Sequence, residues 1–378
     1  MKYKALVIGL MAMGLTACAS KAKPTDPAAL QKITEQTQVD VQWTANIGST
    51  KGLGFKPTVA DGKVYAANDK GQITELDLQT GRILNTIDTK TKLVAGVAVA
   101  GDLAFVGSAD GELLAYNLST KAEAWRVRLT SVLSEPPLML ASVLVVKTRD
   151  GRLTGLDAQT GDIGWSFVGA QSGLKVRGTG SLTPMDERHF LVGQDGGMLQ
   201  LVDASAGTTV FEAPIAFPSG ATDFDRVTEV LSHPIMDGPQ ICAAAFQGAV
   251  TCYDMRDWQP MWSQPLSSSK GSEVYGDLVV LSEDNGLVSA FNRADGKPVW
   301  QNEELKNRRI SAPILLKNGL VVVDFEGYAH ILDPLTGAFI GRTKLPVGAL
   351  TAQPQRLDGM TLLQGASGKL MLVGAGIS

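Results

Sequence analysis

The repeating unit of this chain is clearest in Gly71-Gln72-Ile73-Thr74-Glu75-Leu76-Asp77-Leu78-Gln79-Thr80-Gly81. A strand-like apolar run and a tight turn precede this stretch, and Gly71 ends the turn. A second strand follows, and Asp77 stands six residues after Gly71. The arrangement recurs at eight anchors: Gly71, Gly111, Gly151, Gly197, Gly248, Gly286, Gly327 and Gly368. The first seven are followed by Asp77, Asn117, Asp157, Asp203, Asp254, Asn292 and Asp333. A period of about forty residues made of short strands is typical of a β-propeller with one four-stranded blade per repeat.

Turn chemistry explains the residues that follow the aspartate. The spacing of Asp77 to Gly81 returns at Asp157 to Gly161 and Asp333 to Gly337, and more loosely at Asp203 to Gly207 and Asn292 to Gly296. An Asp or Asn side chain accepts nearby backbone N–H groups, and glycine supplies the positive φ that closes a hairpin. These acidic residues therefore indicate turns and not catalysis.

A bulky residue stands eight positions after five of these turn residues: Trp125, Trp165, Phe211, Trp262 and Trp300. The first and seventh repeats have Asn85 and Gly341 there, and Trp258 falls in a connection. The eighth repeat has no closing strand of its own before Ser378, but Val41-Gln42-Trp43-Thr44 resembles one. We expect this N-terminal strand to pair into the last blade, which leaves no exposed edge between blades one and eight. The predicted fold is an all-β, eight-bladed propeller of four-stranded antiparallel blades.

The N-terminus has the pattern of a bacterial lipoprotein signal. Lys2 and Lys4 precede an apolar run over residues 5–15, which is too short to span a bilayer. Leu15-Thr16-Ala17-Cys18 matches a lipobox, in which the cysteine sulfur receives a lipid and the preceding peptide is cleaved. The sequence therefore predicts a signal peptide over 1–17, lipidated Cys18 with a flexible tether over 18–38, and the propeller over 39–378. A short helix within the tether, over 28–37, is an alternative.

Charge and cysteine usage fit an exported protein. After cleavage the chain has 32 basic and 38 acidic residues, a formal charge of −6, which argues against a nucleic-acid partner. With Cys18 lipidated, Cys242 and Cys252 remain, on the two arms of one hairpin. An oxidising periplasm permits a disulfide if the strands pair them directly, whereas a register shifted by one residue puts them on opposite faces.

From the lipobox to the last blade, this combination resembles the BamB family of outer-membrane protein assembly factors. The resemblance implies a non-catalytic lipoprotein without cofactor, anchored at the periplasmic face of the outer membrane. It also implies membership of the β-barrel assembly machinery, binding to the periplasmic POTRA domains of BamA, and a role in folding and inserting outer-membrane proteins. Unfolded outer-membrane clients are a further partner, held by strand addition to blade edges or loops.

The alternative is an enzyme that uses pyrroloquinoline quinone and calcium, because quinoprotein dehydrogenases share the Asp-x-x-Thr-Gly and Trp pattern. Such enzymes resemble this chain blade by blade, but they commonly carry adjacent cysteines over the quinone and long insertions. This chain has no adjacent cysteines and no insertion long enough to build a cap. His189, His233 and His330 lack the spacing of a zinc site, and we expect no catalytic or metal-binding residues.

Two neighbouring repeats carry extra residues where a binding surface is expected. From closing residue to next anchor glycine, the usual 24 to 28 residues become 32 after Trp165 and 37 after Phe211. Adjacent long loops on a rigid scaffold are a common partner site. By resemblance, the family's BamA contact lies in these loops, and the matching residues are Leu174, Val176, Arg177, Asp225, Arg226 and Glu229.

Two features of the sequence weaken the match to the family's BamA contact. The family has a second acidic residue where this chain has Leu231, so part of the charge is lost. The first loop also has a purely internal interpretation, in which Leu174 and Val176 pack beneath it and Arg177 pairs with Asp223 or Asp225.

Overall fold

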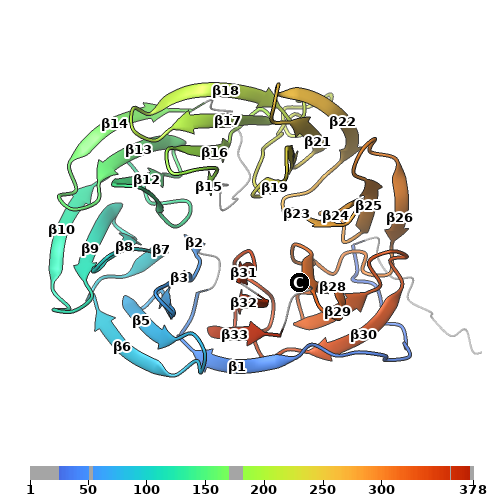
Figure 1. Ribbon diagram of the computed structural model, residues 1–378, viewed down its shortest axis with the longest axis horizontal. Coiled ribbons are helices and arrows are strands. Elements are labelled where there is room, and N and C mark those ends of the chain that lie inside the picture. The colour runs from blue at the N-terminus through green and yellow to red at the C-terminus, as the bar shows by residue number, and fades with distance from the viewer. Residues whose placement is uncertain (1–24, 51–53, 170–181, 358, 375–378) are drawn as a thin grey trace, which may run out of the picture.

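The computed structural model describes residues 25–50, 54–169, 182–357 and 359–374. Eight small sheets are arranged as the blades of a ring (Figure 1). This confirms the predicted eight-bladed, all-β propeller. The described residues contain no helix with the length and apolar character needed to cross a bilayer.

Within each blade, strands adjacent in sequence pair antiparallel. Blade one contains β3 (Thr58–Ala60), β4 (Lys63–Ala67), β5 (Gln72–Asp77) and β6 (Ile83–Asp88). Blade two contains β7 (Leu93–Ala100), β8 (Leu103–Ser108), β9 (Glu112–Asn117) and β10 (Glu123–Arg128). Blade three contains β11 (Leu138–Leu140), β12 (Val143–Lys147), β13 (Arg152–Asp157) and β14 (Ile163–Val168). Blade four contains β15 (Thr183–Pro184), β16 (His189–Gly193), β17 (Met198–Asp203) and β18 (Thr208–Pro214).

The remaining blades repeat this order. Blade five contains β19 (Ile235–Asp237), β20 (Gln240–Ala244), β21 (Gly248–Asp254) and β22 (Gln259–Leu266). Blade six contains β23 (Ser272–Tyr275), β24 (Leu278–Ser282), β25 (Val288–Asn292) and β26 (Pro298–Asn302). Blade seven contains β27 (Ile314–Leu316), β28 (Gly319–Val323), β29 (Tyr328–Leu332) and β30 (Phe339–Lys344). Blade eight contains β31 (Gln355–Leu357), β32 (Met360–Gln364) and β33 (Lys369–Val373).

The fourth strand of blade eight comes from the other end of the chain. Strand β1 (Val41–Asn46) pairs antiparallel with β33, with Trp43 opposite Leu372 and Asn46 opposite Lys369. The predicted closure of the ring by the N-terminal strand is therefore confirmed. Blade two has an addition that the repeat did not predict: β2 (Gly54–Phe55) pairs in parallel with the inner edge of β7.

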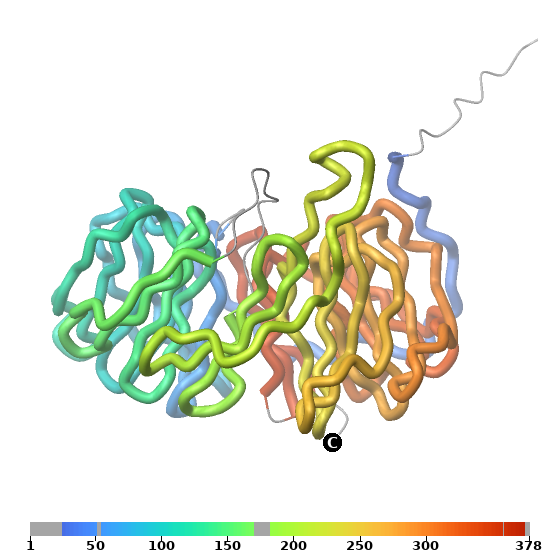
Figure 2. Tube along the Cα trace, turned by 90° about the horizontal axis from the view of Figure 1, so that it is seen from above, coloured from blue at the N-terminus to red at the C-terminus, as the bar shows by residue number. Residues whose placement is uncertain are grey.

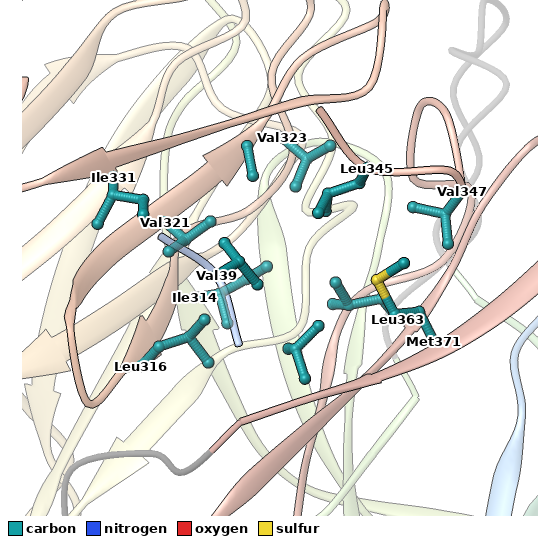
Figure 3. Close-up of a cluster of buried hydrophobic side chains, with 12 residues drawn as sticks. Val39, Ile314, Leu316, Val321, Val323, Ile331, Leu345, Val347, Leu363 and Met371 are labelled. Atoms are coloured by element: carbon teal, nitrogen blue, oxygen red, sulfur yellow. The ribbon is translucent and has the colours of Figure 1, made fainter. Parts of the chain in front are cut away.

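The hydrophobic core lies between blades. Each of the eight buried clusters combines apolar side chains from two neighbouring blades. In the cluster between blades seven and eight, Ile314, Val321 and Ile331 face Leu363 and Met371, and Val39 joins them from the N-terminal segment (Figure 3). Alternating residues of the strands supply these contacts, because successive side chains of a strand point to opposite faces.

A second contact joins the blades at the rim. The closing tryptophan of one blade packs on the turn glycine of the next, where a Cβ on Gly207 would lie 2.4 Å from the Trp165 ring. The Trp165 indole N–H also donates to the carbonyl of Ala204, at 2.7 Å. We call this pair of contacts the indole latch. The other latches pair Trp43 with Gly81, Trp125 with Gly161, Trp262 with Gly296, and Trp300 with Gly337.

The structure explains the two repeats that have Asn85 and Gly341 at the closing position. In blade one, the Asn85 amide donates to the Leu118 carbonyl at 3.3 Å, so a shorter side chain makes the same bond. In blade seven, Gly341 leaves room for the N-terminal segment, and a Cβ there would lie 2.2 Å from the Thr37 carbonyl oxygen. The departures therefore have structural causes.

Cys242 and Cys252 lie directly opposite each other on β20 and β21, and the structure joins them by a disulfide. Both cysteines are buried in the core between blades five and six. The register that places them on opposite faces is not the one observed.

The segment before β1 has a different structure from the one predicted from the sequence. A flexible arm or a short helix was expected there, but residues 26–39 lie as extended chain on blade seven. The Ala28 N–H donates to the Lys306 carbonyl at 2.9 Å, and the Gln36 N–H donates to the Ile340 carbonyl at 2.8 Å. The hydrogen-bonding partners are about 280 to 300 residues distant, so local composition gave no sign of them.

Candidate partner-binding face

Strand order places both long connections on one face of the ring. Because strands alternate in direction, the anchor-glycine turns and the blade-to-blade connections share a face, which we call the loop face. The Asp-x-x-Thr-Gly turns lie on the opposite face. The connection between β18 and β19 rises visibly above the ring on the loop face (Figure 2).

The tip of this connection is closed by its own polar groups. The Thr222 hydroxyl donates to the Asp225 carboxylate at 2.7 Å, and the Asp225 N–H donates back to the Thr222 hydroxyl at 3.1 Å. Hydrogen bonds from Thr222 lower the pKa of Asp225. The Arg226 guanidinium donates to the Gly220 carbonyl at 3.0 Å. The tip therefore presents an ionised Asp and an Arg whose positions are fixed within the loop.

Two phenylalanines project from the same connection. Phe217 is 75% exposed and Phe224 is 68% exposed, more than the other large apolar side chains in the described ranges. The sequence analysis did not select them, although an aromatic residue between two aspartates, as in Asp223-Phe224-Asp225, is a usable signal. Exposed aromatic side chains flanked by charge are typical anchors of protein interfaces.

Glu229 lies at the base of the loop rather than at its tip. It is 4% exposed, and its backbone bridges Asp195 of the neighbouring blade and Phe246. The Phe246 N–H donates to the Glu229 carbonyl at 2.8 Å. The structure thus brings Asp225 and Arg226 together on the surface and separates Glu229 from them by burial.

Four of the predicted site residues lie outside the described part of the chain: Cys18, Leu174, Val176 and Arg177. The latter three belong to the connection between β14 and β15, and the ends of these two strands that it joins are on the loop face.

Histidines and acidic residues are the remaining candidates for catalysis or metal binding. Over the described ranges, no three or more His, Cys, Asp or Glu residues are grouped so that they could hold a metal ion. His233 accepts or donates a hydrogen bond with the Thr183 hydroxyl at 2.7 Å, and burial lowers its pKa to about 3. His330 lies against Asp324 at 3.0 Å. These histidines have structural partners within the fold.

A cavity of about 600 Å³ lies at the centre of the ring, between the inner strands and connections of several blades. It is lined by Lys56, Glu135, His233, Arg356 and several prolines, and Phe55 is its single aromatic residue among the lining side chains described. A quinone cofactor needs a broad aromatic floor for stacking and several oxygen ligands for calcium. This lining does not fit that cofactor.

The repeated blades and the indole latches define an eight-bladed propeller of the quinoprotein-like repeat class. The family described as "Outer membrane protein assembly factor BamB" matches residues 70–302 and 284–374. This chain belongs to the BamB family.

Similar proteins cover nearly the whole chain. The BamB of Bordetella pertussis is 33% identical over 374 residues, covering 98% of this chain and 96% of that protein. The BamB of Burkholderia pseudomallei is 30% identical and covers 96% of this chain and 95% of its own length. The crystal structure of BamB from Moraxella catarrhalis superposes with a TM-score of 0.81 at 25% identity, covering 89% of this chain and all of that one.

A quinohemoprotein alcohol dehydrogenase from Pseudomonas putida gives a TM-score of 0.67 at 13% identity, covering 90% of this chain and 77% of that one. This likeness concerns the propeller fold alone.

Proposed function

We propose that this protein is a non-catalytic scaffold of the outer-membrane β-barrel assembly machinery, which assists folding and insertion of outer-membrane proteins. The single observation that carries this is membership of the BamB family along the entire propeller, at up to 33% identity. The lining of the cavity described above supports the scaffold over a quinoprotein dehydrogenase, since Phe55 is the only large aromatic side chain among its described residues.

The partner of this scaffold is the periplasmic POTRA region of BamA, bound on the loop face. Asp225, Arg226 and the exposed Phe224 support this, because they offer a charged pair beside an apolar anchor on a loop that is already folded. Leu174, Val176 and Arg177 of the neighbouring connection complete the surface. Glu229 acts from below, as a buried support of the loop.

Lipidation of Cys18 anchors the scaffold at the periplasmic face of the outer membrane. Several acyl chains bind a bilayer far more strongly than a single myristoyl chain does. The blades then act as a rigid body that holds the POTRA domains in one orientation while client strands reach the insertase. Eight inter-blade cores and a closed ring support such rigidity.

The experiment is affinity purification of the full-length protein from native membranes, with an absorption spectrum of the eluate. We expect BamA to co-elute without a quinone band. Phe224→Asp should reduce the recovered BamA at least about tenfold, because a hot-spot aromatic contributes about 2 kcal/mol.

Leu335→Asp is the matched control, since Leu335 is 64% exposed on the opposite face. It should leave the recovery unchanged. A quinone with calcium in the eluate, or full recovery of BamA with Phe224→Asp, would contradict the scaffold or its loop-face site respectively.

A further inference from the structure

Residues 26–39 form a strap that is part of the propeller. The Asn307 side chain donates to the Asp26 carbonyl at 3.1 Å, and the Asn318 side chain donates to the Gln38 carbonyl at 3.2 Å. Between these ends, the strap crosses the outer strand β30 at Gly341, where only a residue without a Cβ leaves space for Thr37. Val39 then enters the core between blades seven and eight. The strap is therefore bonded to blade seven along its length.

Two arginines bind the backbone of the strap from inside the blade. Arg308 donates to the Ala28 carbonyl at 2.8 Å, and Arg342 donates to the Gln31 carbonyl at 2.7 Å. Arg308 is itself buried and pairs with Asp324 and Glu326. Because a buried guanidinium held by carboxylates has few alternative positions, the strap binds to a preformed site.

The strap leaves the ring on the loop face. Its first bonded residues, Asp26 and Ala28, lie on the connection between β26 and β27, which is a blade-to-blade connection of that face. Figure 2 shows the described N-terminal segment reaching the same side as the projecting connection between β18 and β19. The N-terminal end of the strap and the projecting connection between β18 and β19 are therefore on one side of the ring.

We infer that the strap shortens the membrane tether and turns the loop face toward the phospholipid headgroups. This inference rests on the lipidation of Cys18 in the proposed function. Only eight residue steps separate Cys18 from Asp26. Such a chain extends to at most about 29 Å, whereas an arm that reached Val39 unattached would extend to about 75 Å. A free arm would let either face meet the bilayer, and the strapped arm does not.

The orientation comes from the covalent tether rather than from charge. Around the exit of the strap, Lys306 and Arg309 stand beside Glu303 and Glu304, so the local charges balance. An electrostatic approach to anionic lipid would weaken with salt, because the Debye length falls to about 3 Å at 1 M. A tether of fixed length keeps its effect at high salt.

The test uses the full-length lipidated protein in phospholipid vesicles that carry a headgroup quencher. Fluorophores are attached at Lys70→Cys, on the loop face, or at Gln79→Cys, on the opposite face. Both positions are exposed and belong to blade one. We expect roughly twofold stronger quenching at position 70, because the short tether starts from the loop face and keeps that face near the bilayer.

The matched variant inserts twenty Gly and Ser residues between Thr25 and Asp26. The strap is retained, but the tether is long enough to free the ring, and the two labels should then be quenched equally. High salt should not change either result.

Equal quenching at the two positions without the insertion would overturn the inference. If such a protein still bound vesicles and co-purified with BamA, the proposed function would stand and the orientation alone would be wrong. A protein that did not bind vesicles would refute the lipidation of Cys18, and the orientation with it.

Discussion

The rings of Phe211 and Trp258 lie against each other with their centroids 4.6 Å apart. Trp258 occupies the turn position that glycine holds in most other repeats, and its φ of 55° shows that it adopts the glycine conformation. The Trp258 N–H donates to the Asp254 carbonyl at 2.7 Å, as Gly81 does to Asp77 at 2.9 Å. Between blades four and five the two positions of the latch are exchanged. Phe211 occupies the closing position on the outer strand, and the tryptophan, Trp258, comes from the turn.

Trp258→Asn should therefore lower the free energy of unfolding by about 2 kcal/mol, through loss of the ring contact and its buried area. Asn tolerates a positive φ, so backbone strain does not contribute. Denaturant unfolding measures the change. No change in the midpoint would mean that the pair of rings does not join blades four and five.

A latch of the common type can be rebuilt between blades one and two. Asn85→Trp alone should destabilise, because Lys121, with a φ of 61°, stands where the ring needs glycine. Combined with Lys121→Gly, the tryptophan should recover its hydrogen bond and packing. We expect a favourable coupling energy of about 1 kcal/mol or more in a double-mutant cycle. Additive effects of the two changes would contradict the latch geometry.

The buried His330 makes stability depend on pH. Burial lowers its pKa, while Asp324 accepts from one ring nitrogen at 3.0 Å and Arg342 donates to the other at 3.1 Å. Burial opposes ionisation of Asp324, but hydrogen bonds from His330, Tyr328 and Arg308 outweigh it and lower its pKa to about 2. Asp324 therefore stays charged throughout the range in which His330 matters.

Below about pH 6.5 the unfolded chain takes up a proton at His330 that the folded protein does not, so stability falls with falling pH. The slope is at most about 1.4 kcal/mol per pH unit for each such histidine. His330→Gln should flatten the profile between pH 7 and pH 5, and His233→Gln, which removes a group with a folded-state pKa of about 3, should flatten it by up to one proton. Unfolding curves across this range measure it, and an unaltered slope in His330→Gln would refute the assignment.

Gly341→Ala should loosen the strap without unfolding the ring. The added methyl group would lie 2.2 Å from the Thr37 carbonyl oxygen. Amide hydrogen exchange at the strap residues around Gln36 should quicken at least about tenfold, which corresponds to about 1.4 kcal/mol of lost local stability.

Gly164→Ala is the control for this change. Gly164 is also in an outer strand, but the nearest atom to an added Cβ is 3.7 Å away. In this variant, amide hydrogen exchange at the strap residues should match that of the unsubstituted protein. Equal exchange in both variants would show that Gly341 is not needed for seating the strap.

The blades and their closure could be predicted because each repeat carries its own turn chemistry and Trp43 marks the missing strand. The position of Trp258 in the turn was not predicted, because a bulky residue replaces the glycine by which the turn is recognised in other repeats. The strap could not be predicted from its own residues. It is held through backbone carbonyls such as that of Gln31, which every residue type provides, by side chains about 300 positions away.

The candidate site was predicted in part. Insertion lengths located the connection that carries Asp225 and Arg226. They did not reveal that Glu229 is buried, because burial there follows from a bridge to Phe246 on a neighbouring blade. Phe217 and Phe224 were missed because an isolated aromatic residue in a loop has no repeat with which to compare it.

The pairing of β1 with β33 also bears on the timing of biosynthesis. Val41 pairs with Val373. Strand β1, the first of the described strands to be synthesised, therefore cannot pair until β33, the last of them, has been made. The entropic cost of closing so large a loop grows only logarithmically with its length, but contacts between residues so far apart in the sequence form slowly. A nascent chain interrupted anywhere before β33 would leave β1 and Trp43 without their partner strand, and an unpaired strand edge of this kind favours aggregation.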